Sequence, residues 1–259
     1  MQFTFTFSRK PYNIRRQQVL TPPYKPETHS KPLPDKRTAK MNLEQLDHIR
    51  AMIARARARD PWSTQLTELL DRRTTHLHTA IKLPPEQASP VLARFVLRYI
   101  AHVPDFIEAI ADLTREAGID SEVKPLLNIA CGYFVSPPNI LAGRSRLATL
   151  LDEAYLAHRL LEEVNDRFIA QCGIPLAPMD MTRANIIVHE LIGEPFANEL
   201  DQAVLFSAEL LLDQHRFEGK NFRRYVALHK QRGWSEELNR WPCLAENLDI
   251  DVRFGGNHS

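Results

Sequence analysis

The chain has 259 residues, of which 44% are hydrophobic, and a formal net charge of +1. This composition can supply the core of one large domain or two small ones. Three cysteines are too few for a disulfide framework and lie too far apart for a zinc knuckle, so we expect reduced thiols and a cytoplasmic protein.

Hydrophobic runs are short throughout the sequence. No stretch of about 18 uncharged apolar residues is present, and the N-terminus lacks the apolar segment of a secretory signal. We therefore expect no membrane partner.

Glycine is scarce, with nine in the chain, and this excludes several common enzyme motifs. A phosphate-binding loop needs a glycine five residues before Gly219-Lys220, where the chain has Gln214. The glycine spacing of a dinucleotide fingerprint and of a nucleophile elbow is also missing. The zincin motif fails because Gly193 stands where the second histidine would follow His189-Glu190.

The first 40 residues differ from the rest in charge and proline content. They contain six prolines and nine Lys or Arg against two acids, so they carry about +7 and leave about −6 for the remainder. A basic, proline-rich segment without helical periodicity cannot bury enough surface to offset its ordering entropy, which predicts disorder over residues 1–40. An alternative is that Met41 is the true start, because Asn42 is a suitable N-cap for the first helix.

From Asn42 onward, hydrophobic residues recur every three or four positions, as in amphipathic α-helices. The third helix opens at Ser89-Pro90, is kinked or divided at Pro104 and ends at Gly118. The predicted helices, in chain order, cover residues 42–56, 63–83, 89–118, 120–130, 144–171, 180–192, 196–211 and 221–230. With the third helix divided at Pro104, the one at 144–171 is the longest.

These elements predict an all-α fold, either a compact multi-helix bundle or an orthogonal helical array, with a disordered basic N-terminal segment. Residues 41–244 are expected to form a single domain, and residues 245–259 a loose C-terminal tail. On the two central helices, the predicted core faces are centred on Leu161 and Ile187, while Asp152 is expected to point away from the core.

Polar residues on the borders of these two core faces are the best candidates for a functional site. His158, Glu162 and Asn165 share one flank of the helix over 144–171, and Asn185 and His189 share one flank of the next helix. If the flanks face each other, His158, Glu162 and His189 could bind a divalent transition metal, and Asn165 and Asn185 could hold a small polar ligand. The commoner role of such residues is a polar network that fixes how the helices pack.

Two functional hypotheses follow from this sequence. The first is a non-catalytic binding or regulatory module that acts through a pocket or helix surface on a small ligand or a protein partner. The alternative is a metal-assisted enzyme with a His/Glu/Asn site between the two central helices. Nucleic acid is disfavoured as a partner because the body of the chain is acidic. A second apolar stripe at Leu205 and Leu212 would either be covered by residues 234–241 or form a homodimer contact.

Overall fold

A computed structural model describes the fold of most of the chain after residue 42. The described residues are 43–58, 61–84, 86–142, 146–211, 219–234 and 250–252. Our predictions for residues 1–40, for Leu212 and for a covering segment at 235–241 therefore lie outside the described residues.

The all-α prediction is confirmed, since the structure consists of helices packed on one another with a single short pair of strands in its described part. The helices are α1 (Leu43–Arg57), α2 (Pro61–Thr74), α3 (Ala88–Glu116), α4 (Asp120–Val135), α5 (Arg146–Cys172), α6 (Thr182–Ile192), α7 (Phe196–Leu211) and α8 (Lys220–Arg232), with a 3-10 turn η1 (Asn139–Leu141). The strands are β1 (Ile81–Lys82) and β2 (Asp251–Val252).

Helix α3 is not divided at Pro104 but continues through it, and with 29 residues it is longer than the 27 of α5, in contrast to our prediction for the longest helix. Its end is as predicted. Gly118 adopts a positive φ of 68°, and the Ile119 N–H reaches back to the Thr114 carbonyl at 2.9 Å, which satisfies an end carbonyl of the helix.

Helix α2 begins and ends earlier than the sequence pattern suggested. It starts at Pro61, which suits the first turn of a helix because its missing N–H has no helical partner there. It stops at Thr74, where the hydroxyls of Thr74 and Thr75 donate to the carbonyls of Asp71 and Arg72. Such bonds compete with continuation of the helix.

Beyond α2 the chain forms β1, which pairs antiparallel with β2 near the other end of the chain. Ile81 is paired with Val252, and Lys82 with Asp251. Val252 is buried. The described part of the predicted loose tail is therefore held against the helical body, in contrast to our expectation.

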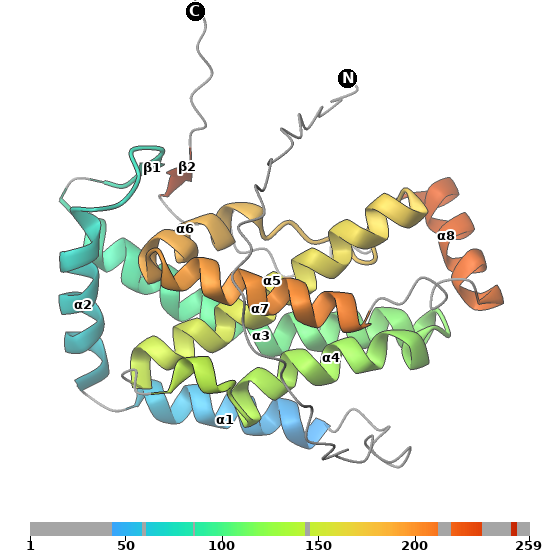
Figure 1. The fold of residues 1–259 in the computed structure, drawn as a ribbon, viewed down its shortest axis with the longest axis horizontal. Helices are drawn as coiled ribbons and strands as arrows, with labels where there is room; N and C mark the ends of the chain where they lie inside the picture. Colours follow the sequence, from blue (N-terminus) through green and yellow to red (C-terminus); the bar gives the residue numbers. More distant parts are fainter. Residues whose placement is uncertain are drawn as a thin grey trace, which may run out of the picture. The chain divides into compact units, whose positions relative to one another are not determined.

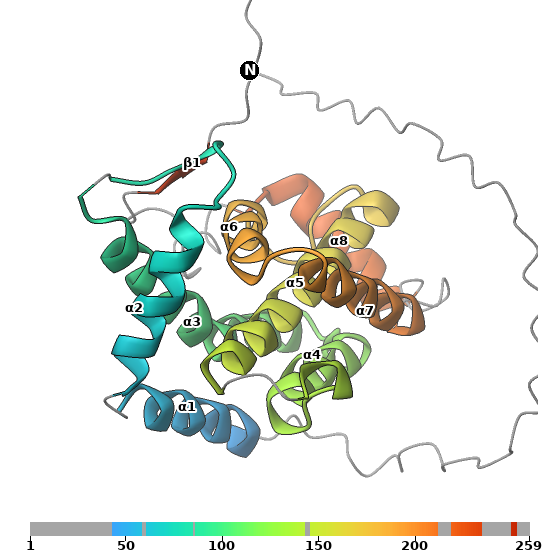
Figure 2. The same cartoon turned by 60° about the vertical axis from the view of Figure 1, so that its left-hand side comes forward.

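Helix α5 is the central element of the bundle, as Figures 1 and 2 show from two directions. It packs against α3, α4, α6 and α7. Every residue from Leu150 to Leu161 is buried except Arg159, which is half-buried. A helix that is buried on all sides must place its polar residues against partners within the protein.

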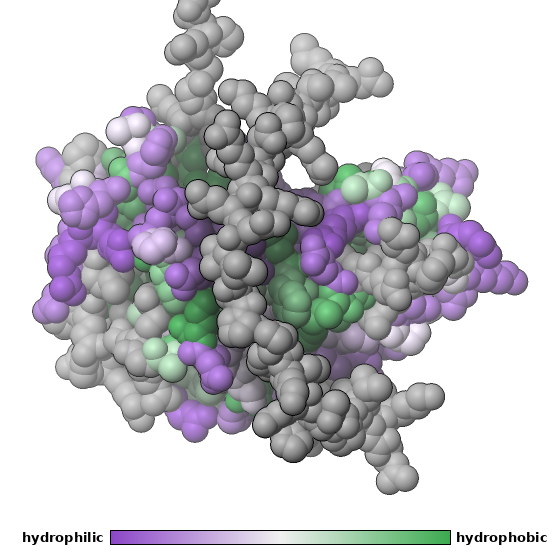
Figure 3. All heavy atoms as spheres, viewed as in Figure 1, coloured by the Kyte–Doolittle hydropathy of each residue, from purple (hydrophilic) through white to green (hydrophobic). Residues whose placement is uncertain are grey.

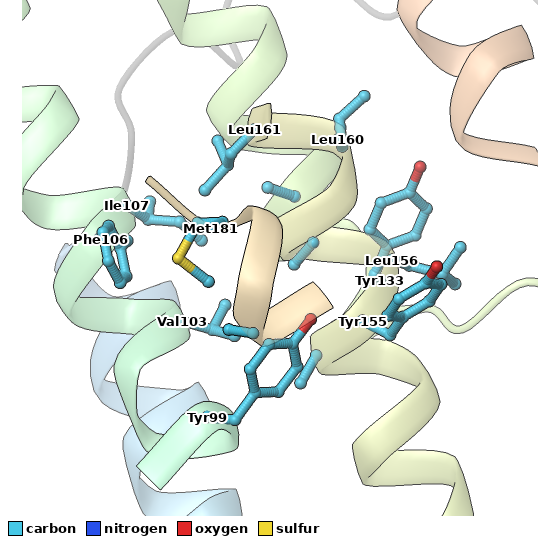
Figure 4. Packing of buried hydrophobic residues seen from close by; sticks show 14 of the residues in the cluster. Tyr99, Val103, Phe106, Ile107, Tyr133, Tyr155, Leu156, Leu160, Leu161 and Met181 are labelled. Atoms are coloured by element: carbon cyan, nitrogen blue, oxygen red, sulfur yellow. The ribbon is translucent and has the colours of Figure 1, made fainter. Parts of the chain in front are cut away.

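The core predictions for the two central helices hold for their apolar centres. Leu161 on α5 is 2% exposed and Ile187 on α6 is 4% exposed. Figure 4 shows the packing around α5, with Tyr99 and Val103 contributed by α3. The prediction for Asp152 is wrong, because this residue is fully buried on the all-round buried helix.

No helix in the described ranges is long and apolar enough to cross a membrane. On the face drawn in Figure 3, hydrophilic residues gather over α2 and over α8.

Candidate functional site

The two flanks singled out in the sequence meet where α5 packs against α6. Asn185 Nδ2 donates to Glu162 Oε2 at 2.7 Å, and Thr182 Oγ1 donates to Glu162 Oε1 at 2.9 Å. Both oxygens of the Glu162 carboxylate thus accept hydrogen bonds from α6. This is the predicted convergence, although only Glu162 and Asn185 of the five candidate residues make it directly.

Helix α3 joins this contact through Tyr99, whose side chain is fully buried. The Tyr99 hydroxyl donates to Asn185 Oδ1 at 2.6 Å, so the Asn185 amide accepts from α3 and donates to α5. Burial is the main reason that the pKa of Tyr99 is raised well above its usual value, with a further contribution from the negative charge of Glu162. The phenol therefore remains a hydrogen-bond donor.

Arg159 extends the network from α5 to α7. Its guanidinium bonds to Glu162 through Nη1 and to Asp201 Oδ1 through Nε at 3.1 Å. The Tyr155 hydroxyl donates to the same Asp201 oxygen at 2.9 Å. Burial alone lowers the pKa of Arg159, but the two carboxylates outweigh it, so the net shift is upward and the guanidinium stays charged.

We call Tyr99, Tyr155, Arg159, Glu162, Thr182, Asn185 and Asp201 the polar cluster. Its outer edge, which we call the rim, consists of Arg159, His189, Asn198 and Asp201. At the rim, His189 Nε2 lies 3.1 Å from Asn198 Oδ1 and 3.7 Å from Asp201 Oδ2. The side chains of Arg159, His189 and Asp201 retain 21%, 21% and 25% exposure, so solvent reaches the rim.

His158 turns away from the cluster toward α3 and is completely buried. Its Nε2 lies 2.9 Å from the Tyr99 backbone carbonyl, which can only accept, so Nε2 carries the proton. The hydrogen bonding of α3 is already interrupted at this point. Pro104 has no N–H, so the carbonyl of Ile100, the residue after Tyr99, loses its usual helical donor. Burial lowers the pKa of His158 to about 3, which makes it a neutral imidazole.

Asn165 also leaves the cluster and supports the segment that connects α5 to α6. Its Oδ1 accepts a hydrogen bond from the Ala177 N–H at 3.1 Å. The amide therefore satisfies a buried backbone donor.

The three predicted metal ligands do not share one space. His158 bonds to α3, Glu162 to α6 and Arg159, and His189 faces α7. Across the described ranges, no group of three or more His, Cys, Asp and Glu side chains is arranged to hold a metal ion.

The sequence reasoning missed Arg159, Tyr99 and Asp201. One signal was available for Arg159, which lies three residues before Glu162 and therefore on the same face of the helix. Tyr99 and Asp201 belong to helices whose contact with this face no local pattern specifies.

Comparisons of this chain with known protein families, with curated proteins and with solved structures return no match.

Proposed function

We propose that this protein is a non-catalytic binding module whose small polar ligand contacts the rim of the polar cluster. The observation that supports this most is the arrangement of Arg159 and Asp201, which are half-buried, reachable by solvent and fixed by the buried residues behind them. Side chains that are held in place before a ligand arrives lose little entropy on binding.

Groups with shifted pKa values gather around this region, as they do at many functional sites. The pKa values of Tyr99 and Tyr155 are raised by burial, and that of Arg159 by its two carboxylate partners. The pKa of Asp166, one turn further along α5, is raised by burial and by the charge of Glu162.

A binding role fits the cluster better than acid-base catalysis. Glu162 is buried and its two oxygens already accept from Arg159, Thr182 and Asn185, whereas a general base needs a lone pair directed at the substrate. The metal-assisted alternative from the sequence gains no specific observation among the described contacts.

Charge at the rim indicates the kind of ligand. The polar cluster behind the rim carries one positive charge, on Arg159, against two negative charges, on Glu162 and Asp201, so its net charge is negative. Asp201 Oδ1 accepts from Tyr155 and Arg159. Among the described contacts, the partner of Oδ2 is His189 Nε2, at 3.7 Å. The rim therefore favours a ligand that brings a hydrogen-bond donor with a positive charge, such as a small amine.

The test is titration of the full chain with a panel of small amines, followed by amide NMR at constant ionic strength. Ethanolamine is the first probe, and ethylene glycol is its uncharged match. We expect saturable shifts at His189, Asn198 and Asp201 with the amine. Asp201→Asn should abolish them, whereas Glu209→Gln, an exposed acid on the same helix, should not.

Two results would count against this function. Equal responses in the wild type, Asp201→Asn and Glu209→Gln would mean that the amines bind through general charge attraction. A stoichiometric transition metal in the purified protein, lost in the double variant His158→Ala and His189→Ala, would instead favour the metal-assisted enzyme.

A further inference from the structure

A pocket lies at the end of α2, on elements that do not contribute to the polar cluster. Its volume is about 720 Å³, and its described lining consists of Asp71, Arg72, Arg73, Thr75 and His76. This volume falls within the range of about 300–1,000 Å³ that is usual for small-molecule sites. Figures 1 and 2 show α2 at the periphery of the bundle, and the lining residues Asp71, Arg72, Thr75 and His76 are exposed.

The two arginines of this pocket have no carboxylate partner among the described residues. Arg72 Nε donates to the carbonyl of Glu68 at 3.1 Å, a bond within its own helix that leaves its two Nη groups available. The adjacent acid, Asp71, is bonded by the hydroxyl of Ser89 at the start of α3. The acid is therefore paired with another helix.

The charges at the pocket do not cancel. Arg72 and Arg73 contribute two positive charges and Asp71 one negative charge. The C-terminus of α2 adds about −0.5 and the N-terminus of α3 about +0.5. The lining thus keeps about one net positive charge.

Arg73 is held in position by a helix that is distant in the sequence. Its Nη2 donates to the carbonyl of Ile192, the last residue of α6, at 2.9 Å. Gly193 allows this approach, because a Cβ atom there would lie only 2.4 Å from Arg73 Nη1. One half of the guanidinium is thus anchored to α6 before any ligand is present, which lowers the entropic cost of binding.

We propose that this pocket binds a small molecule through an anionic group, a phosphate or a carboxylate, held by the guanidinium groups of Arg72 and Arg73 with His76 beside them. Guanidinium groups match the planar, bidentate geometry of both anions. This site is independent of the polar cluster, whose net charge is negative and whose proposed ligand carries a positive charge.

The experiment is a titration of the full chain with inorganic phosphate and, separately, with malonate, at constant ionic strength and followed by amide NMR. We expect saturable shifts that centre on residues 71–76. Arg72→Gln and His76→Gln should each weaken binding about tenfold, the usual effect of removing one charge-assisted hydrogen bond. Both side chains are exposed and make few contacts, so the variants should fold.

Arg224→Gln removes an exposed arginine from α8 and is the matched control. It should leave the affinity unchanged. The tighter of the two probes identifies the anion. The proposal is overturned if neither probe binds, if the shifts lie elsewhere, or if the control weakens binding as much as Arg72→Gln does.

Discussion

Replacing His158 with glutamine should remove much of the protein's sensitivity to mild acid. The imidazole is fully buried and neutral, with a pKa lowered by burial to about 3 in the folded protein, against about 6.5 in an unfolded chain. Between these two values, the unfolded state binds a proton that the folded state does not. Stability therefore falls as the pH decreases from about 6.5 toward 3.

The size of the effect follows from the same two values. A pH of 4.5 is two units below the pKa of this histidine in the unfolded chain, where it is therefore protonated. In the folded protein the histidine is still neutral at this pH. At about 1.36 kcal/mol for each unit, the free energy of unfolding should be about 2.7 kcal/mol lower than at pH 7 because of His158 alone. Glutamine does not titrate and retains an N–H that can donate to the Tyr99 carbonyl.

Urea unfolding of the wild-type protein and of His158→Gln, each at pH 7 and pH 4.5, measures this difference. Carboxylates also titrate in this interval, but they are common to both proteins and cancel in the comparison. His48→Gln, which replaces an exposed histidine on α1, is the matched control and should lose as much stability as the wild type. An equal loss in His158→Gln and the wild type would refute the buried neutral imidazole.

Two further predictions concern the packing of the fold. Leu161→Ala and Ile187→Ala should each lower the free energy of unfolding by about 2–5 kcal/mol, because both side chains fill the core between the central helices; neutral effects in urea unfolding would contradict this packing. Gly193→Ala should cost about 1–3 kcal/mol, since φ is +84° there and the new methyl group would meet Arg73. Gly132→Ala, inside α4 with open space around it, should be neutral or raise the melting temperature slightly.

The helices themselves could be predicted because their signals are local. Apolar spacing sets the buried face, and the turn at Gly118 is specified by residues within a few positions. The extension predicted for α2 failed for the opposite reason. Ile81 continues the apolar spacing of that helix, but its partner is Val252, near the other end of the chain. A periodic pattern predicts that a residue is buried, but it does not predict which residue it packs against.

The same distinction explains the partial success at the candidate site. Helical spacing correctly placed Glu162 and Asn185 on facing flanks, since α5 and α6 are consecutive and pack together. It could not show that Asp201 on α7 would face Arg159, because that contact depends on how a third helix returns to the bundle. His158 was predicted on the same flank as Glu162, but it is fully buried and its Nε2 donates to a backbone carbonyl of α3, a contact that has no signature in the sequence.

The polar residues were interpreted either as a ligand site or as a network that fixes how the helices pack. Each interpretation applies to a different depth of the same cluster. In its interior, Tyr99 bonds to Asn185 and Asn185 bonds to Glu162, and all three are buried, so they join three helices and are shielded from solvent. At the rim, Asp201 accepts from Tyr155 and from Arg159, which also bonds to Glu162, and the side chains of Asp201 and His189 still reach solvent. The interior network is therefore what fixes the geometry of the surface on which we place the ligand, and a structural role for the first supports a binding role for the second.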